Sequence, residues 1–246
     1  MIHTGFRGGD FDSVDFADID YYEAQVPYAV DFSELEERWF GKVRRILRED
    51  DTRIGLVGRD SWEFYFEGQN TERNESFADF KSDIFDCYYF CELAESLAVD
   101  SVIIPLGENV SYDQFETLVS ECYDLLGDLQ RLTFSFGDIE FSKMVNHMKQ
   151  INPVLERTMT AGFRIDSDLL VDNGFNTHVD PGFNIVKRVN VVDVDIGVFS
   201  EYYNDNPLYT NFMDAIYEND RDVDVCIKSS RHNFKKREQV FTESLS

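Results

Sequence analysis

The segment GFNTHVDPGFN, residues 174–184, places a histidine close to a carboxylate in a chain that has only four histidines. A single valine separates His178 from Asp180, so both side chains could reach one metal ion. The same residues also fit a turn, in which Asp180 before Pro181 starts the bend and Gly182 supplies a permissive backbone. Two interpretations therefore stay open, a pair of metal ligands or a turn in an acidic protein.

A third metal ligand would have to come from a distant part of the chain. His232 follows the strand-like segment DVDVCIKSS, and Arg237 follows in HNFKKREQVFTES. An iron(II) centre with two histidines and one carboxylate leaves positions open for a co-substrate and dioxygen. In outline, the set His178, Asp180, His232 and Arg237 resembles the iron(II)/2-oxoglutarate oxygenases, whose motif is His-x-Asp, a distant His, then Arg or Lys. The resemblance implies iron(II) and 2-oxoglutarate as cofactors, with Arg237 pairing with the co-substrate carboxylate.

Other acidic residues are explained more simply as parts of strands. Asp193 and Asp195 in VVDVDIG could bind a divalent cation, but the flanking valines favour a half-buried strand with its acids in water. Asp220, Asp222 and Asp224 have the pattern of a solvated strand edge, where charge discourages unwanted pairing. We therefore predict a structural role for all of these carboxylates.

Several standard catalytic and binding motifs are absent from the sequence. It contains no G-x-x-x-x-G-K-[ST] loop, no G-x-G-x-x-G after a strand, no G-x-S-x-G and no H-E-x-x-H. Its four cysteines form no CxxC pair, and we expect them to be buried small hydrophobes. Nucleotide-dependent chemistry of the common kinds is therefore not expected.

The composition describes an acidic globular chain. Of its 246 residues 43% are hydrophobic, which is ample for a packed core. A net charge of -25 repels nucleic-acid phosphates, so we expect no direct nucleic-acid binding. No apolar run is long enough for a membrane span, and the N-terminus lacks the pattern of a signal peptide. We expect a soluble, intracellular protein, cytoplasmic or virion-associated.

The predicted fold class is α+β, mixed, with three portions. Residues 1–25 show no clear period and are predicted to form an irregular arm rich in aromatic and acidic residues. Residues 26–152 form a helix-rich α/β portion, which includes a helix capped by Ser33, a hairpin over 53–68 and a helix over 77–98. Residues 153–246 form a strand-rich portion, interrupted by one helix over 207–217 and packed with the preceding part in one compact domain.

The middle of the chain has the most regular pattern. Strands over 101–106 and 131–136 alternate with helices over 111–128 and 138–152, the last of which ends before Pro153. This β-α-β-α order predicts a parallel strand pair with a right-handed crossover. Further strands are predicted within 157–172, 183–199 and 222–230.

The leading functional prediction is a non-enzymatic acidic protein that binds a protein partner or assembles with its own copies. The missing catalytic motifs, dense aromatics and strong charge suit a structural or inhibitory component of a virus or mobile element. This interpretation needs no cofactor. Two alternatives stay open: the oxygenase described above, and a mimic of nucleic-acid charge that blocks a nucleic-acid-binding protein.

Overall fold

Eight strands form a closed barrel, in which each strand pairs in parallel with its neighbours in chain order and β8 returns to β1. A computed structural model describes residues 2–8, 19–25, 37–49, 52–58, 90–92, 94–106, 112–123, 131–136, 141–156, 161–168, 185–218, 222–229 and 233–245. The strands are β1 Ile2–Gly8, β2 Tyr21–Gln25, β3 Arg53–Val57, β4 Ser101–Leu106, β5 Arg131–Phe136, β6 Gly162–Asp166, β7 Val189–Val194 and β8 Val223–Ile227.

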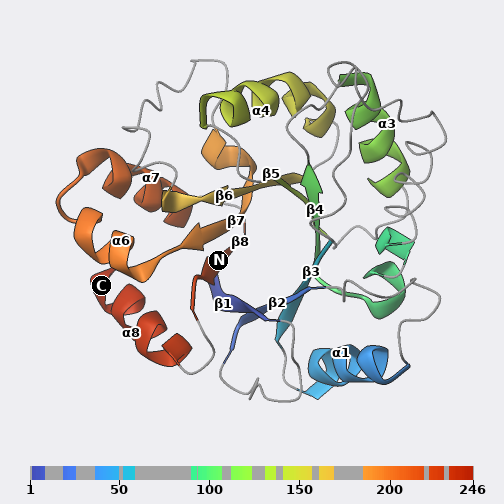
Figure 1. The fold of residues 1–246 in the computed structure, drawn as a ribbon, viewed down its shortest axis with the longest axis horizontal. Coiled ribbons are helices and arrows are strands. Elements are labelled where there is room, and N and C mark those ends of the chain that lie inside the picture. The colour runs from blue at the N-terminus through green and yellow to red at the C-terminus, as the bar shows by residue number, and fades with distance from the viewer. Residues whose placement is uncertain are drawn as a thin grey trace, which may run out of the picture.

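Helices surround the ring of strands (Figure 1). They are α1 Glu37–Glu49, α3 Tyr112–Tyr123, α4 Phe141–Leu155, the 3-10 helix η2 Ile185–Arg188, α6 Ile196–Tyr202, α7 Pro207–Tyr217 and α8 Phe234–Ser244. Residues 90–92 and 94–97, which precede β4, are also helical. A closed ring of eight parallel strands inside a layer of helices is a (β/α)8 barrel.

The prediction of a mixed α+β fold is therefore wrong. Its β-α-β-α unit is present as β4, α3, β5 and α4, and β4 pairs in parallel with β5 as expected. The alternation of strand and helix is not confined to this unit. It continues around the barrel, so the region after residue 152 contains α6, α7 and α8 as well as three strands.

The prediction of an irregular arm over residues 1–25 is wrong for the parts that form β1 and β2. β1 lies between β8 and β2, so it closes the barrel. Its apolar residue Phe6 is buried on the helix side, whereas the alternate residues His3, Gly5 and Arg7 are small or polar. Strands of parallel sheets usually read as continuous apolar runs, and this one does not.

Three local predictions also need correction. β3 pairs in parallel with both β2 and β4, so the segment from Arg53 has no edge left for a hairpin partner. The strand expected over 183–199 ends at Val194, because the Asp195 side chain accepts hydrogen bonds from the Gly197 and Val198 amides and starts α6. Helix α4 continues past Pro153 to Leu155.

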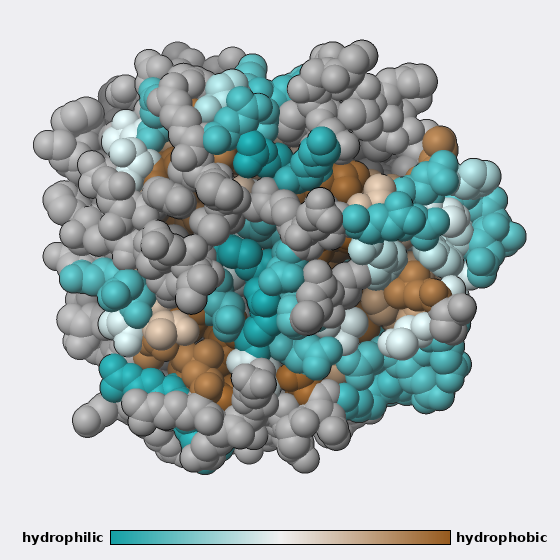
Figure 2. All heavy atoms as spheres, turned by 180° about the vertical axis from the view of Figure 1, so that it is seen from behind, coloured by the Kyte–Doolittle hydropathy of each residue, from teal (hydrophilic) through white to brown (hydrophobic). Residues whose placement is uncertain are grey.

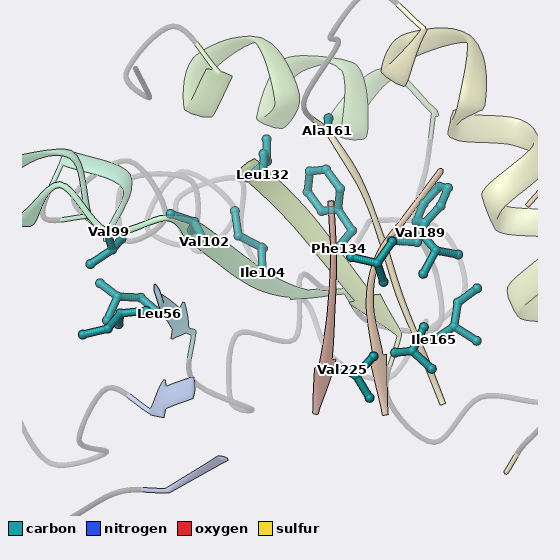
Figure 3. Packing of buried hydrophobic residues seen from close by; sticks show 14 of the residues in the cluster. Leu56, Val99, Val102, Ile104, Leu132, Phe134, Ala161, Ile165, Val189 and Val225 are labelled. Carbon is teal, nitrogen blue, oxygen red and sulfur yellow. The ribbon is translucent and has the colours of Figure 1, made fainter. Parts of the chain in front are cut away.

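The hydrophobic core divides into two clusters that occupy opposite faces of the strands. The larger cluster joins the strands to the surrounding helices, and Figure 3 shows part of it, including Leu56, Ile104 and Phe134. The smaller cluster consists of one residue from each of four strands: Val57, Ile103, Val191 and Cys226. Each is directly next in its strand to a residue of the larger cluster. Because successive strand residues point to opposite faces, this second cluster lies inside the barrel.

The described surface is mostly polar. On the face drawn in Figure 2, hydrophilic residues gather near the centre, with hydrophobic patches visible between them. Leu208 is the one large hydrophobic side chain that is exposed among the described residues, at 48%. None of the helices in the described ranges is both long enough and apolar enough to cross a membrane.

Candidate active site

Charged side chains gather at the carboxyl ends of the barrel strands. There they line a pocket of about 330 Å³, whose walls are Arg7, Arg164, Asp166, Asp193, Cys226, Ile227, Lys228 and Ser229. Strand pairing brings several of them together, because Arg7 of β1 lies opposite Glu23 of β2 and Asp166 of β6 lies opposite Asp193 of β7. In (β/α)8 barrels, this end of the strands is where active sites form.

Glu23 is the buried carboxylate at the base of this group. Its side chain has no exposed surface, and its Oε2 accepts hydrogen bonds from Arg7 Nε at 2.9 Å and from Arg164 Nη1 at 2.8 Å. The Tyr21 hydroxyl donates to the other oxygen at 3.0 Å. Burial alone would raise the pKa of Glu23, but the two guanidinium groups, Arg164 foremost, outweigh it and hold the pKa below its ordinary value. Glu23 is therefore ionised.

Arg164 links this carboxylate to a second one. Its Nε donates to Asp193 Oδ2 at 2.6 Å, and its Nη2 also pairs with Asp193 Oδ1. The Arg164 side chain is only 7% exposed. Burial opposes its charge, but Glu23 and Asp193 raise its pKa well above the ordinary value, so it stays cationic. Asp193 is thus an ion-pair partner inside the barrel mouth, which corrects the prediction that its carboxylate lies in water.

Lys228, directly after β8, holds two further carboxylates. Its Nζ lies 2.6 Å from Asp166 Oδ2 and 2.7 Å from Asp168 Oδ2. Burial acts to lower the pKa of Lys228, but these hydrogen bonds raise it above the ordinary value, so the ammonium group stays protonated. Its backbone is also held in place: the Lys228 amide donates to the Val194 oxygen at 2.9 Å, and Arg237 Nη1 donates to the Lys228 oxygen.

Cys226 lies in the pocket wall, and its surroundings make its thiol unreactive. The residue is 3% exposed. Burial, together with the charges of Glu23 and Asp193, raises the pKa of the thiol well above its ordinary value. Since the thiolate is the nucleophilic form, the pocket favours chemistry by fixed charges over covalent catalysis by this cysteine.

A separate charged network occupies the other end of the barrel, where the strands begin. Asp224 is fully buried, pairs with Arg131 Nη2, and has Arg53 Nε 3.5 Å from its Oδ1. Burial raises the pKa of Asp224 to about 6 despite these cations. Arg53 Nη1 also lies 3.1 Å from His3 Nε2. Asp224 is therefore not part of a solvated strand edge as predicted. At this end of the barrel it has a structural role.

The residues predicted from sequence to form a metal site are only partly described. His178, Asp180 and His232 lie outside the described residues, so their grouping stays a prediction. Arg237 lies in α8, where it contacts the Lys228 backbone oxygen. Glu23, Arg164 and Lys228 were not recognised as site residues. The signal that could have identified them is a charged residue in the middle of a short strand, as for Glu23 in β2 and Arg164 in β6, or directly after one, as for Lys228 after β8.

The described residues at the mouth do not form a metal site. Three or more His, Cys, Asp or Glu side chains arranged to hold a metal ion are not found within the described ranges. Asp166 and Asp168 do converge on one point, but the Lys228 ammonium group occupies it. The other two carboxylates, Glu23 and Asp193, are each paired with arginine. The described carboxylates at the mouth are thus engaged by arginine or lysine, where a metal ion would need them as ligands.

Comparison with known proteins finds likeness in structure but none in sequence. No protein-family model and no curated protein matches the chain. Endonuclease IV from Thermus thermophilus is 11% identical, with 99% of this chain and 98% of that chain covered and a TM-score of 0.61. A xylose isomerase domain containing protein from Salmonella typhimurium is 7% identical, with 94% and 89% covered and a TM-score of 0.59. The IOLI protein with a bound zinc atom is 12% identical, with 92% and 87% covered and a TM-score of 0.55.

These likenesses establish the fold and overturn two predictions. The prediction of a non-enzymatic assembly or inhibitory protein from a virus or mobile element is contradicted, because the barrel is shared with xylose isomerase-like proteins and an endonuclease. The expectation that no cofactor is needed is contradicted as well, because a barrel of this fold holds zinc. At 7 to 12% identity, these likenesses show the fold and do not by themselves show a substrate.

Proposed function

We propose that the protein is an enzyme that acts on a small polyhydroxylated carbonyl compound of sugar type, at the mouth of the barrel. The observation that carries the proposal is the gathering of guanidinium, ammonium and carboxylate side chains around one pocket of about 330 Å³. Guanidinium and ammonium groups donate hydrogen bonds, whereas carboxylates accept them. A compound with several neighbouring hydroxyl groups can satisfy both kinds of partner at once.

The proposed reaction is proton transfer at the carbon next to the carbonyl group. Removing this proton places negative charge on the carbonyl oxygen, and preorganised cations stabilise such a charge. Lys228 and Arg7 are the partly exposed cations of the pocket, with 38% and 39% of their side chains accessible. Asp166 and Asp193, which also line the pocket, are the candidate bases. The likeness to xylose isomerase-like barrels supports a substrate of this class.

The protein's charge argues against nucleic acid as the substrate. A net charge of -25 repels a phosphate backbone, so the likeness to endonuclease IV is taken as one of fold. A protein partner or self-association, also expected from the sequence, stays a prediction. Because a barrel of this fold holds zinc, the activity is to be measured on EDTA-treated protein and after addition of zinc or magnesium.

Solvent-hydrogen exchange tests the proposal directly. The protein is incubated in D2O with a panel of aldoses, ketoses and cyclic hydroxyketones, and loss of the signal of the hydrogen next to the carbonyl is followed by NMR. We expect exchange with at least one compound. Lys228→Met removes the cation nearest two carboxylates. It is expected to slow exchange by roughly 100-fold, the effect of deleting one oxyanion-stabilising group.

Lys143→Met is the matched control, because Lys143 lies exposed on α4 and is not among the residues that line the pocket. This variant is expected to exchange at the wild-type rate. Far-UV circular dichroism of both variants separates a lost fold from lost chemistry. The proposal fails if no compound exchanges under any of the three metal conditions, or if Lys228→Met and Lys143→Met have the same rate.

A further inference from the structure

Arg7 is the cation of the pocket whose side-chain hydrogen-bond donors are least occupied by described residues. Its Nε donates to Glu23 Oε2 at 2.9 Å. No second hydrogen bond of the Arg7 side chain is found within the described residues. The side chain is 39% exposed and lines the pocket. With respect to the described residues, both terminal amino groups of the fork therefore have donors left for a ligand.

The neighbouring cations are largely occupied. Arg164 donates from Nε, Nη1 and Nη2 to Asp193 and Glu23, and only 7% of its side chain is exposed. The Lys228 ammonium group already has two carboxylate partners. Among the described cations that line the pocket, Arg7 consequently has the most side-chain donors left for a ligand.

The Arg7 guanidinium group is also held in a fixed orientation. The carboxylate that accepts from its Nε is Glu23, which is fully buried and also bound by Arg164 and Tyr21. A planar group fixed at one edge presents its other edge with little further loss of conformational entropy. Its two parallel donors match the geometry of a carboxylate or phosphate, which an ammonium group cannot do.

We propose that the substrate carries an anionic group, a carboxylate or a phosphate, that is bound by the two terminal amino groups of Arg7. This inference rests on the proposed function and narrows its substrate class to acidic polyhydroxylated compounds. When Arg7 binds the anionic group, Lys228, Asp166 and Asp193 face the rest of the substrate. Arg7 is thus a specificity-determining residue for the reaction.

Calorimetry with matched ligands tests the inference. Three compounds that share one carbon skeleton are titrated into the protein: a neutral sugar, the corresponding sugar acid and the corresponding sugar phosphate. We expect the wild type to bind one of the anionic forms at least about tenfold more tightly than the neutral one, since a charge-assisted hydrogen bond contributes that much or more. Comparing the sugar acid with the sugar phosphate shows whether Arg7 prefers a carboxylate or a phosphate.

Two variants of Arg7 and one control complete the design. Arg7→Gln is expected to bind the neutral and anionic compounds with affinities within about threefold of each other, whereas Arg7→Lys keeps part of the preference because it retains the charge without the fork. Arg44→Gln, at an exposed arginine of α1, is expected to keep the wild-type preference. Circular dichroism confirms that each variant is folded.

The outcomes separate this inference from the proposed function. If the neutral sugar binds the wild type as tightly as both anions, or if Arg7→Gln keeps the preference, the assignment of Arg7 is overturned while the polyol-binding pocket stands. If none of the three skeleton-matched compounds binds, and no sugar exchanges its hydrogen with solvent, both proposals are overturned together.

Discussion

Replacing Glu23 by glutamine removes the charge at the centre of the barrel mouth while keeping the size of the side chain. Glu23 has no exposed surface and accepts hydrogen bonds from Arg7, Arg164 and Tyr21. In the variant, the amide oxygen can still accept from the two guanidinium groups, but those bonds lose their charge-assisted character. Arg164 then has Asp193 as its remaining carboxylate partner in a nearly closed site.

The Glu23→Gln variant is expected to be less stable, because part of the Arg164 charge is no longer neutralised. Removing one partner of a buried ion pair destabilises a protein by roughly 3 to 5 kcal/mol, because the other charge stays buried. Asp193 still neutralises part of the Arg164 charge, so we expect a loss near the lower end, about 3 kcal/mol. Urea unfolding at pH 7 measures it. Glu201→Gln, at an exposed glutamate of α6, is the control, and its unfolding free energy is expected to change by less than about 0.5 kcal/mol.

The difference in unfolding free energy between wild type and Glu23→Gln is also expected to depend on pH. The pKa of Glu23 is lowered in the folded protein, so its stabilising contribution is present above the ordinary pKa of a glutamate. It is lost as the pH falls through the lower, folded-state value. The difference between wild type and Glu23→Gln is therefore expected to shrink on acidification. A variant within about 1 kcal/mol of wild type at pH 7 would refute the view that this carboxylate holds Arg7 and Arg164.

Two further predictions concern the barrel itself. Because burial raises the folded-state pKa of Asp224 from 3.8 to about 6, wild type should lose stability relative to Asp224→Asn as the pH rises from about 4 to about 7, by on the order of 2 to 3 kcal/mol. Urea unfolding across this range checks it, and a constant difference would contradict it. In Gly162→Ala the new Cβ would lie 2.5 Å from the Arg188 backbone oxygen and 2.6 Å from Asn190 Oδ1, so a loss of about 1 to 3 kcal/mol is expected. Gly41→Ala, which meets no atom within 4 Å on α1, should instead gain about 0.5 to 1 kcal/mol, and equal effects at both glycines would count against the packing argument.

Local sequence patterns were sufficient for many of the individual elements. The apolar run Ser101–Leu106 was recognisable as a buried strand, and the helix over Pro207–Tyr217 was predicted with the bounds that the structure has. The parallel pairing of β4 with β5 followed from the helix between them. These features depend on residues that are near one another in the chain, so periodicity and turn signals describe them.

The closed barrel could not be read in the same way, because buried charged side chains share its interior with the small apolar cluster. In β1, β2 and β8, residues such as Arg7, Glu23 and Asp224 alternate with apolar ones, which is the pattern of a strand with one face in water. The sequence therefore indicated an irregular arm and a solvated edge. Closure of the sheet turns the same alternate residues inward.

What the sequence by itself determined is thus the set of strands and helices near the middle of the chain, the acidity and the absence of common motifs. Only the tertiary structure decided which charges meet. Glu23 and Arg164 are 141 residues apart, and Arg131 and Asp224 are 93 residues apart, yet each pair is joined inside the barrel. A buried charge is stable when an opposite charge lies beside it, and that partner is supplied by the closing of the barrel, whereas no local pattern records it.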